Sequence, residues 1–390
     1  MNILFLCKEY PPHVVGGVGI YMEEMTREIA KLGHRVFVMT TGKDGEVHEE
    51  NREGVTIIRI CTARKEAKEY FRKKVERTAE RFEYSHLVAQ RLKDIVKKHS
   101  IEIIESTDAR AEGFWYYLWN RHIPLVIKLH TSETLVFKLN HEPVTLDIKL
   151  LKKLEEFWLL QADTIIGVTQ AIAGMSMKYY SINNKPVRVI PNPVDVDLFV
   201  PRDEECNPLN VLYVGRLEFR KGVHILLRAI PQILRRIPEA SFTLIGADCG
   251  MKDYLLKGIK KAGCERNVQF IVHICRSDLV EYYEKCGLVG VPALWENFPY
   301  VCLDAMSCGK SVVASNAGGI PELLEDGVYG MLVSPGSANE LAQEVVNLLS
   351  DEKLRLNLGN KAREKMVDRF SPRVIAEKTL SLYEEVRRKA

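Results

Sequence analysis

The sequence predicts an α/β protein with two doubly wound domains, each a parallel sheet covered by helices on both faces. The chain has 390 residues, which is too many for one small core. Short β-branched runs alternate with helical patterns along it, as in parallel sheets with helical crossovers. The alternation restarts after "VRVIPNPVDVDLFVPRD", where three prolines exclude a continuous helix. We therefore expect a boundary near residues 190–205 and place the domains at 1–195 and 196–371.

The expected strands are short apolar runs rich in valine, isoleucine and leucine. In the first half they are "NILFL", "RVFVMTT", "VTIIRI", "IEIIES", "PLVIKLH" and "DTIIGVT". In the second half they are "LNVLYVG", "ASFTLIG", "NVQFIVH", "LVGVPA", "KSVVAS" and "GMLVS". In an open sheet of this kind, ligands bind beyond the carboxyl ends of the strands, so the functional residues are expected there.

Composition excludes several classes of protein. The 55 basic and 52 acidic side chains nearly balance, which argues against a protein that mainly coats nucleic acid. The nine cysteines include no Cys-x-x-Cys pair, so neither a zinc framework nor a disulfide scaffold is indicated. The chain starts directly with an apolar strand and has no window of 18 apolar residues. We expect a soluble, cytoplasmic protein.

Each half opens with a strand, a turn and a helix. In the first half Gly16, Gly17 and Gly19 precede the helix, where glycine lets the backbone approach a ligand and amides face an anion or a sugar oxygen. The alternative is a plain flexible turn. The pattern is not the dinucleotide fingerprint, because Met22 stands where glycine or alanine is expected.

In the second half Arg216 and Lys221 bracket the loop between strand and helix. A guanidinium and an ammonium at this spacing could hold the two phosphates of a diphosphate, helped by the helix start. The alternative is a pair of solvated loop cations. We expect the neighbouring Arg220 to point to solvent.

The stretch "WENFPYVCLDAM" carries two carboxylates around a helix start. Pro299 suits the first turn and leaves the amides of Tyr300 and Val301 directed at an anion. Glu296 lies ahead of the helix and Asp304 on its body, where carboxylates can accept hydrogen bonds from ribose or hexose hydroxyls. The alternatives are a favourable helix-start charge for the glutamate and a surface position for the aspartate.

His130 ends the strand "PLVIKLH" and should emerge at the carboxyl edge of the first sheet. There it could donate a hydrogen bond to a ligand or stabilise negative charge. A core histidine bonded to a backbone carbonyl is an equally good interpretation.

Two motifs resemble known sites without matching them. "CGKS" at 308–311 lacks the glycine of a phosphate-binding loop, because Asp304 stands at that position, and it precedes a strand. "DVD" at 195–197 resembles a metal-binding Asp-x-Asp, but it follows "PNP" and fits turn chemistry better. We expect no metal.

Together, "YPPHVVGGVG", "VGRLEFRKG" and "WENFPYVCLDAMSCGKSVVASNAGGIPELLEDGVYGMLV" resemble the retaining glycosyltransferase family 4, also called group 1, of the GT-B fold. The resemblance covers nearly the whole chain. It implies two Rossmann-like domains that face each other across a cleft. It also implies that the final helix, 372–390, packs back on the first domain.

The resemblance assigns roles to the residues singled out above. Glu296 would contact the transferred sugar and Asp304 the ribose, although the family normally has glutamate at the second position. The diphosphate would be held by Arg216 and Lys221, and His130 would lie beside the sugar. Gly16 and Gly17 match the loop over the diphosphate, and Gly318 and Gly319 match the Gly-Gly before Glu322.

The implied reaction is transfer of a sugar, expected to be a hexose, from a nucleotide diphosphate sugar to an acceptor hydroxyl. The anomeric configuration would be kept, and no cofactor or metal would be needed. The base stays open, because Val272 or His273 replaces a glycine common in the family. A sugar-nucleotide epimerase or hydrolase, or a non-catalytic binder, remains an alternative.

The acceptor is poorly specified by the sequence. Position alone suggests His13, Asp108 and Glu133 for its site, and a sugar, a glycan or a lipid-linked molecule would fit. The basic, amphipathic segment 64–82 could contact an anionic membrane peripherally. An ordinary packed helix is the other interpretation.

Overall fold

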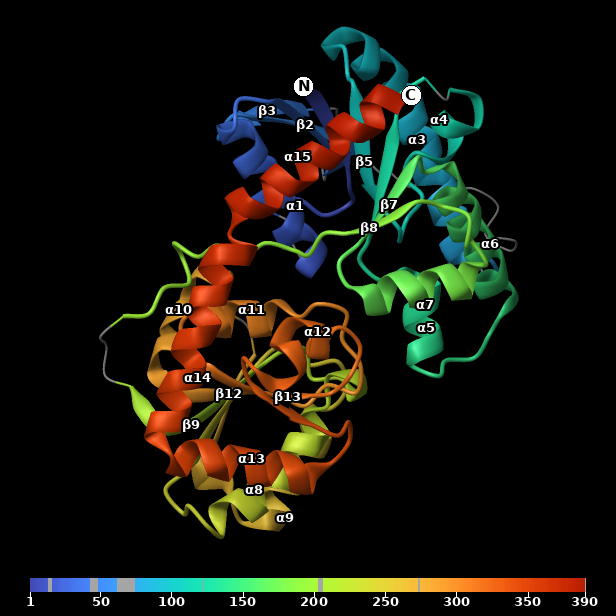
Figure 1. Ribbon diagram of the computed structural model, residues 1–390. Coiled ribbons are helices and arrows are strands. Elements are labelled where there is room, and N and C mark those ends of the chain that lie inside the picture. The colour runs from blue at the N-terminus through green and yellow to red at the C-terminus, as the bar shows by residue number, and fades with distance from the viewer. Residues whose placement is uncertain are drawn as a thin grey trace. The chain divides into compact units, whose positions relative to one another are not determined.

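The computed structural model describes residues 1–12, 16–42, 48–61, 74–120, 122–202, 206–272 and 274–389. The chain divides into two compact units (Figure 1). Unit 1 comprises Met1–Pro193 and Pro372–Ala390, and unit 2 comprises Val194–Ser371. Each unit contains its own sheet, and together they give the α/β architecture with two parallel-dominated sheets that the sequence predicts.

The sheet of unit 1 has the order β3-β4-β2-β1-β5-β6-β7-β8. Its strands are β1 (Asn2–Leu6), β2 (Arg35–Gly42), β3 (His48–Arg52), β4 (Val55–Cys61), β5 (Ile103–Thr107), β6 (Leu125–Leu129), β7 (Thr164–Gly167) and β8 (Val187–Val189). All described pairs are parallel except β3 with β4. The sequence missed β3, whose five residues are exposed and polar, and β8, which lies in the expected connector.

The helices of unit 1 are α1 (Gly17–Lys31), α3 (Glu76–His99), α4 (Phe114–Trp119), α5 (Glu133–Leu139), α6 (Leu146–Gln161), α7 (Gln170–Tyr180) and α15 (Pro372–Lys389). The last of these returns to unit 1 and lies beside α1 (Figure 1). Tyr383 of α15 donates a hydrogen bond to buried Glu105 of β5, which fixes the helix on the sheet.

The sheet of unit 2 is parallel, with the order β11-β10-β9-β12-β13-β14. Its strands are β9 (Asn207–Val214), β10 (Ser241–Ile245), β11 (Val268–Ile271), β12 (Cys286–Val291), β13 (Ser311–Ser315) and β14 (Met331–Val333). The helices are α8 (Val223–Leu234), α9 (Lys252–Ala262), α10 (Arg276–Lys285), α11 (Tyr300–Ser307), α12 (Ile320–Leu324), α13 (Ala338–Ser350) and α14 (Glu352–Lys365). All of these strands match runs expected from the sequence.

Strand order determines where a ligand can approach each sheet. In unit 2 the chain passes from β9 to β10 on one side, and β12 pairs with β9 on the other. Loops diverge beyond the carboxyl ends of strands at such a reversal, and open α/β sheets bind their ligands there. The equivalent reversal in unit 1 lies at β1, between β2 and β5.

A membrane-spanning helix would need a long apolar stretch. None of the helices within the described ranges has one.

Candidate functional site

The loop after β9 is locked against the loop after β12. Gly222 has a φ of +71°, and a Cβ there would lie 1.8 Å from the carbonyl oxygen of Pro292. The amide of Leu294 donates to the carbonyl of Arg220 at 2.8 Å. Glycine is therefore required at 222 by both its conformation and this close approach. The contact fixes the basic loop 216–221 beside the segment that carries Glu296.

A second glycine fixes the backbone of Glu296. Gly318 has a φ of +62°, and a Cβ there would lie 1.8 Å from the Glu296 carbonyl oxygen. The amide of Gly319 donates to the same oxygen at 2.9 Å. Gly318 and Gly319 thus fix the backbone of the loop that carries Glu296.

Cations surround the Glu296 carboxylate, whose side chain is only 10% exposed. Lys221 Nζ forms an ion pair with Glu296 Oε1. Arg220 Nη1 lies 3.5 Å from the same oxygen and donates to the carbonyl of Trp295 at 3.1 Å. Its Nη2 donates to Glu218 Oε1 at 2.9 Å.

The expectation that Arg220 points to solvent is therefore wrong. Its side chain is 12% exposed, because the planar guanidinium reaches two carboxylates and a carbonyl at once. The sequence pattern showed the charge of Arg220 but not the carboxylate of Glu218 two residues earlier as its partner.

Arg216 is the most open cation of this group, with 51% of its side chain exposed. Its Nη2 lies 3.2 Å from Glu218 Oε1. Below it, the Tyr213 hydroxyl donates to the Arg216 carbonyl at 3.1 Å. Burial raises the pKa of Tyr213, and the charges of Glu296 and Glu218 raise it further. Arg216, Lys221 and Glu296 are thus brought to one place, around the end of β9.

Asp304 lies on α11 and is 3% exposed, so it is not a surface residue. Arg276 Nη2 donates to Asp304 Oδ1 at 2.9 Å. The guanidinium also lies over the rings of Tyr300, at 5.2 Å, and Phe199, at 4.9 Å. Burial raises the pKa of Asp304, and Arg276 partly offsets the rise. Sequence reasoning missed Arg276, which stands at the start of α10 with no motif around it.

The buried thiol of Cys302 is influenced by the charges of both Glu296 and Asp304. Burial raises the pKa of Cys302, the charges of Glu296 and Asp304 raise it further, and Lys221 lowers it. Both acidic side chains therefore lie close to the same residue of α11.

Pro299 lies just before α11 and not in its first turn, where it was expected. Pro299 is the N-cap, with a φ of −73° and a ψ of 120°, and Tyr300 is the first helical residue. The first bonds inside the helix are donated to the Pro299 carbonyl by Cys302, at 3.0 Å, and Leu303, at 3.3 Å. The amides of Tyr300 and Val301 precede this ladder, as expected of a helix start.

In unit 1, His130 follows β6 and its ring lies 4.9 Å from that of Tyr21. The Nε2 atom is buried and bonds to none of the described residues. Burial lowers the pKa of His130 to about 3, and the charge of Lys128 contributes. The imidazole is therefore neutral at physiological pH, with one nitrogen as donor and the other as acceptor.

Asp108 and Glu133, suggested for the acceptor, are both bound within unit 1. Asp108 is fully buried, and its Oδ1 accepts the His130 amide at 2.9 Å. Burial raises its pKa to about 7. Glu133 forms ion pairs with Arg77, at 2.6 Å, and with buried Arg81.

Gly16 and Gly17, which were predicted to bind the diphosphate, lie at the start of α1. Gly16 is its N-cap in an extended conformation, with space around its Cα, and Gly17 is the first helical residue. His13 lies outside the described residues, as do residues 64–73 of the basic segment 64–82. The described part of that segment enters α3.

The two look-alike motifs have structural roles. Lys310 of "CGKS" donates to the carbonyls of Glu284, at 2.7 Å, and Cys286, at 3.1 Å. Asp195 Oδ1 of "DVD" accepts the amides of Asp197, at 3.2 Å, and Leu198, at 2.9 Å, as expected of a turn. Within the described ranges, no three histidine, cysteine, aspartate or glutamate residues gather as metal ligands would.

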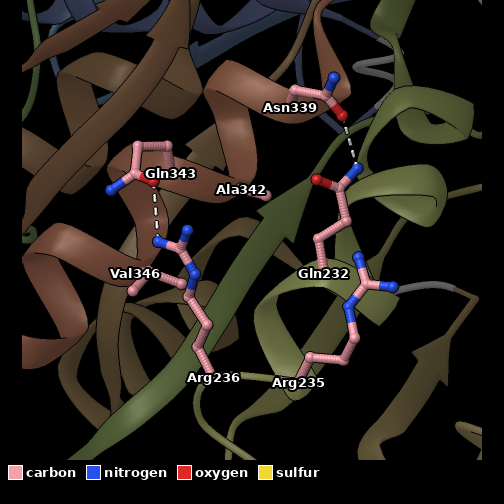
Figure 2. Close-up of a pocket in the computed structure, with 7 residues that line it drawn as sticks. All are labelled: Gln232, Arg235, Arg236, Asn339, Ala342, Gln343 and Val346. Atoms are coloured by element: carbon pink, nitrogen blue, oxygen red, sulfur yellow. Dashed lines mark hydrogen bonds between the residues drawn. The ribbon is translucent and has the colours of Figure 1, made fainter.

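A separate hollow lies between α8 and α13 (Figure 2). Gln232 donates to Asn339 at 2.8 Å, and Arg236 donates to Gln343 at 2.7 Å. None of the residues predicted for the site lines it.

Two family models match the chain. The model described as "Glycosyltransferase Family 4" matches residues 15–198, and that described as "Glycosyl transferases group 1" matches residues 201–365. Between them they leave only residues 1–14, 199–200 and 366–390 unmatched.

Individual relatives are distant in sequence but similar in length. The chain is 25% identical to a glycogen synthase of Mycobacterium tuberculosis, over 98% of this chain and 94% of that protein. Sucrose-phosphate synthase from Thermosynechococcus elongatus is 22% identical with a TM-score of 0.81, over 100% of both chains. Anabaena HepE in complex with UDP-glucose is 21% identical with a TM-score of 0.72, over 99% of this chain and 100% of that one. The chain therefore belongs to the group 1 glycosyltransferases of the GT-B fold.

Proposed function

We propose that this glycosyltransferase is a retaining hexosyltransferase that uses a nucleotide diphosphate sugar as donor. The observation that carries the proposal is the cluster of Arg216, Arg220, Lys221 and Glu296 at the carboxyl ends of β9 and β12. Three cations there face two carboxylates, so the cluster has positive charge to offer an anionic ligand.

The diphosphate of the donor is held by Arg216 and Lys221. Arg216 is half exposed, and its fork geometry suits two phosphate oxygens. Lys221 is paired with Glu296 in the ligand-free chain, and a phosphate would compete for its ammonium. When the Lys221 ammonium moves to the phosphate, Glu296 can accept hydrogen bonds from the sugar hydroxyls. Arg220 keeps the Glu296 carboxylate in place.

The nucleoside end of the donor is assigned to α11. Asp304, oriented by Arg276, accepts the ribose hydroxyls, and the amides of Tyr300 and Val301 face a phosphate. Aspartate reaches one methylene less far than the usual glutamate. The structural neighbour from Anabaena binds UDP-glucose, and uridine is therefore the first nucleoside to test in the donor.

From the family resemblance, Gly16 and Gly17 are assigned to the diphosphate and His130 to the sugar; within unit 1, Gly16 caps α1 and the His130 ring lies beside Tyr21. A neutral imidazole can donate a hydrogen bond to a sugar hydroxyl without repelling the cations that hold the phosphates. The acceptor belongs to the loops after β1, β5 and β6, and a glycan is the first class to test because one relative is a glycogen synthase.

The chemistry requires no metal and no cofactor in this proposal, since side-chain cations stabilise the charge that builds on the leaving diphosphate. Retention follows if the leaving phosphate takes the acceptor proton on the face from which it departs. The bond from the anomeric carbon to the phosphate oxygen then breaks as the bond to the acceptor oxygen forms. Glu296 orients the sugar instead of attacking it, because Arg220 still pairs with its carboxylate after Lys221 has moved to the phosphate.

A thermal-shift panel of UDP, GDP and ADP sugars tests the donor site, followed by acceptor screening with the best donor. Release of nucleoside diphosphate that requires an acceptor supports a transferase. Consumption of donor without acceptor would indicate an epimerase or hydrolase, and binding without turnover would indicate a non-catalytic binder. The anomeric configuration of the product, read by NMR, tests retention.

A further inference from the structure

The loop that connects β6 to α5, residues 130–134, has a strained backbone. Thr131 has a φ of +82°, a conformation that β-branched residues rarely adopt. Such strain persists only where the surroundings determine the conformation, and it is concentrated at functional sites. Thr131 directly follows His130, so whatever holds the loop also sets the direction of the imidazole.

Asp108 holds the first part of this loop. Its Oδ1 accepts the amide of His130 at 2.9 Å, and the amide of Thr131 also stabilises the carboxylate. Asp108 follows β5, the strand beside β6, so its hydrogen bond to His130 joins the ends of two neighbouring strands.

Glu155 of α6 holds the second part from the opposite side. It is 1% exposed, and its Oε1 accepts the amide of Thr134 at 3.3 Å. Its Oε2 accepts the hydroxyl of Thr134 and, at 2.7 Å, that of Tyr180. Tyr180 also forms a hydrogen bond with Ser132. Burial raises the pKa of Glu155 to about 8, and this buried carboxyl group organises two hydroxyls and one amide around a single short loop.

We propose that Glu155 is a positioning residue, which fixes the strained loop 130–134 and thereby the orientation of His130 for catalysis. The inference rests on the role proposed above for His130. Glu155 does not touch a ligand, because it is covered by Thr134 and Tyr180. Burying a carboxyl group without a cation is costly, so the hydrogen bonds to the loop account for its presence better than core packing does.

Three variants test whether Glu155 positions the loop 130–134. Thr134→Val keeps the side-chain shape and removes one hydroxyl from Glu155, Glu155→Ala removes the carboxyl group, and Glu155→Gln retains an acceptor for the Thr134 amide. Asp163→Asn is the matched control, since Asp163 Oδ2 accepts the Leu125 amide at 2.8 Å at the opposite end of β6.

The first measurement needs no substrate. Proton–carbon NMR of histidine labelled at Cε1 follows His130, whose signal is assigned by its loss in His130→Gln. In the wild-type chain and in Asp163→Asn the signal should not titrate between pH 5 and 8. In Thr134→Val and Glu155→Ala the signal should shift, because the imidazole changes its orientation, and Glu155→Gln should keep much of the wild-type position. An unchanged signal in folded Thr134→Val overturns the inference, whether or not Glu155→Ala folds.

The second measurement separates this inference from the proposed function. With UDP-glucose as probe, Thr134→Val should lower kcat about tenfold while KM changes less than about twofold, because the donor is held in unit 2. The double variant Thr134→Val/His130→Ala should be no slower than His130→Ala. If His130→Ala turns over normally while Thr134→Val still shifts the His130 NMR signal, the proposed catalytic role of His130 is wrong. The positioning of the loop by Glu155 then still holds.

Discussion

Lys221 and Glu296 form an ion pair that joins the loop after β9 to the loop after β12. The lysine side chain is 25% exposed and the glutamate side chain 10%, so neither charge is fully solvated. The pair is therefore partly shielded from solvent and is not a fully exposed surface salt bridge. We interpret it as the resting state of a donor site, in which each partner occupies the place of a ligand group.

Lys221→Ala and Glu296→Ala should each lower turnover by about two to three decades and leave the fold intact. The lysine loses contact with the leaving diphosphate and the glutamate loses contact with the sugar. Steady-state kinetics with the preferred donor measures the effect, and circular dichroism checks the fold. Turnover near that of the wild type in either variant would remove that residue from the mechanism.

Asp304→Asn should raise KM for the donor about tenfold and change kcat less than about threefold. Contacts to the ribose are made equally in the ground and transition states, so their loss affects binding. Asp304→Glu should bind donor within about threefold of the wild type, since it restores the residue common in the family. The control is Asp253→Asn, an exposed aspartate of α9, and an equal effect there would contradict the assignment.

Gly318→Ala should destabilise unit 2 by roughly 3 kcal/mol or more, because the new methyl group would meet the Glu296 carbonyl and the backbone has a positive φ. Gly263→Ala is the matched control, with a φ of +65° and no atom within 4 Å of the added Cβ. It should cost only about 1 kcal/mol, from the backbone conformation alone. Urea unfolding measures both, and equal losses would show that the close approach to Glu296 is unimportant.

The stability of unit 1 should depend on Asp108 in a defined direction. Burial raises its pKa from 3.8 to about 7, so between these values the folded chain binds more protons than the unfolded chain. Stability should therefore fall as pH rises from about 4 to 7, by up to about 1.4 kcal/mol per pH unit, and become constant above. Comparing urea unfolding of wild type and Asp108→Asn across this range isolates the contribution. A difference that is independent of pH, or that grows in the opposite direction, would contradict it.

The strands of both sheets could be predicted well, because strands buried on two faces appear as continuous apolar runs. The runs "VLYV" in β9 and "VVA" in β13 show this directly. By contrast, β3 has only polar, exposed residues, and β8 has three residues before a proline-rich segment. β3 has no apolar residue and β8 has only two valines, so both are strands because they pair with a neighbouring strand, β4 and β7 respectively.

The positions of Lys221, Glu296 and His130 beyond the ends of strands could be predicted from the sequence, and their roles in a donor site stay a prediction. Partners from other parts of the chain could not be predicted. Arg276 reaches Asp304 from α10, and Arg220 turns inward because Glu218 and Glu296 lie together. Glu155 reaches Thr134 from α6, 21 residues away. These contacts depend on packing between elements, which no local spacing encodes.

Arg216 and Lys221 together should supply most of the affinity for the diphosphate of the donor. Isothermal titration calorimetry with UDP, GDP and ADP tests it most directly, using the wild type, the double variant Arg216→Ala/Lys221→Ala, and Arg235→Ala from the separate hollow as control. At least one nucleotide should bind the wild type and Arg235→Ala alike, and bind the double variant at least about a hundredfold more weakly. Equal affinity for the double variant, or no binding of any of the three to the wild type, would contradict the account.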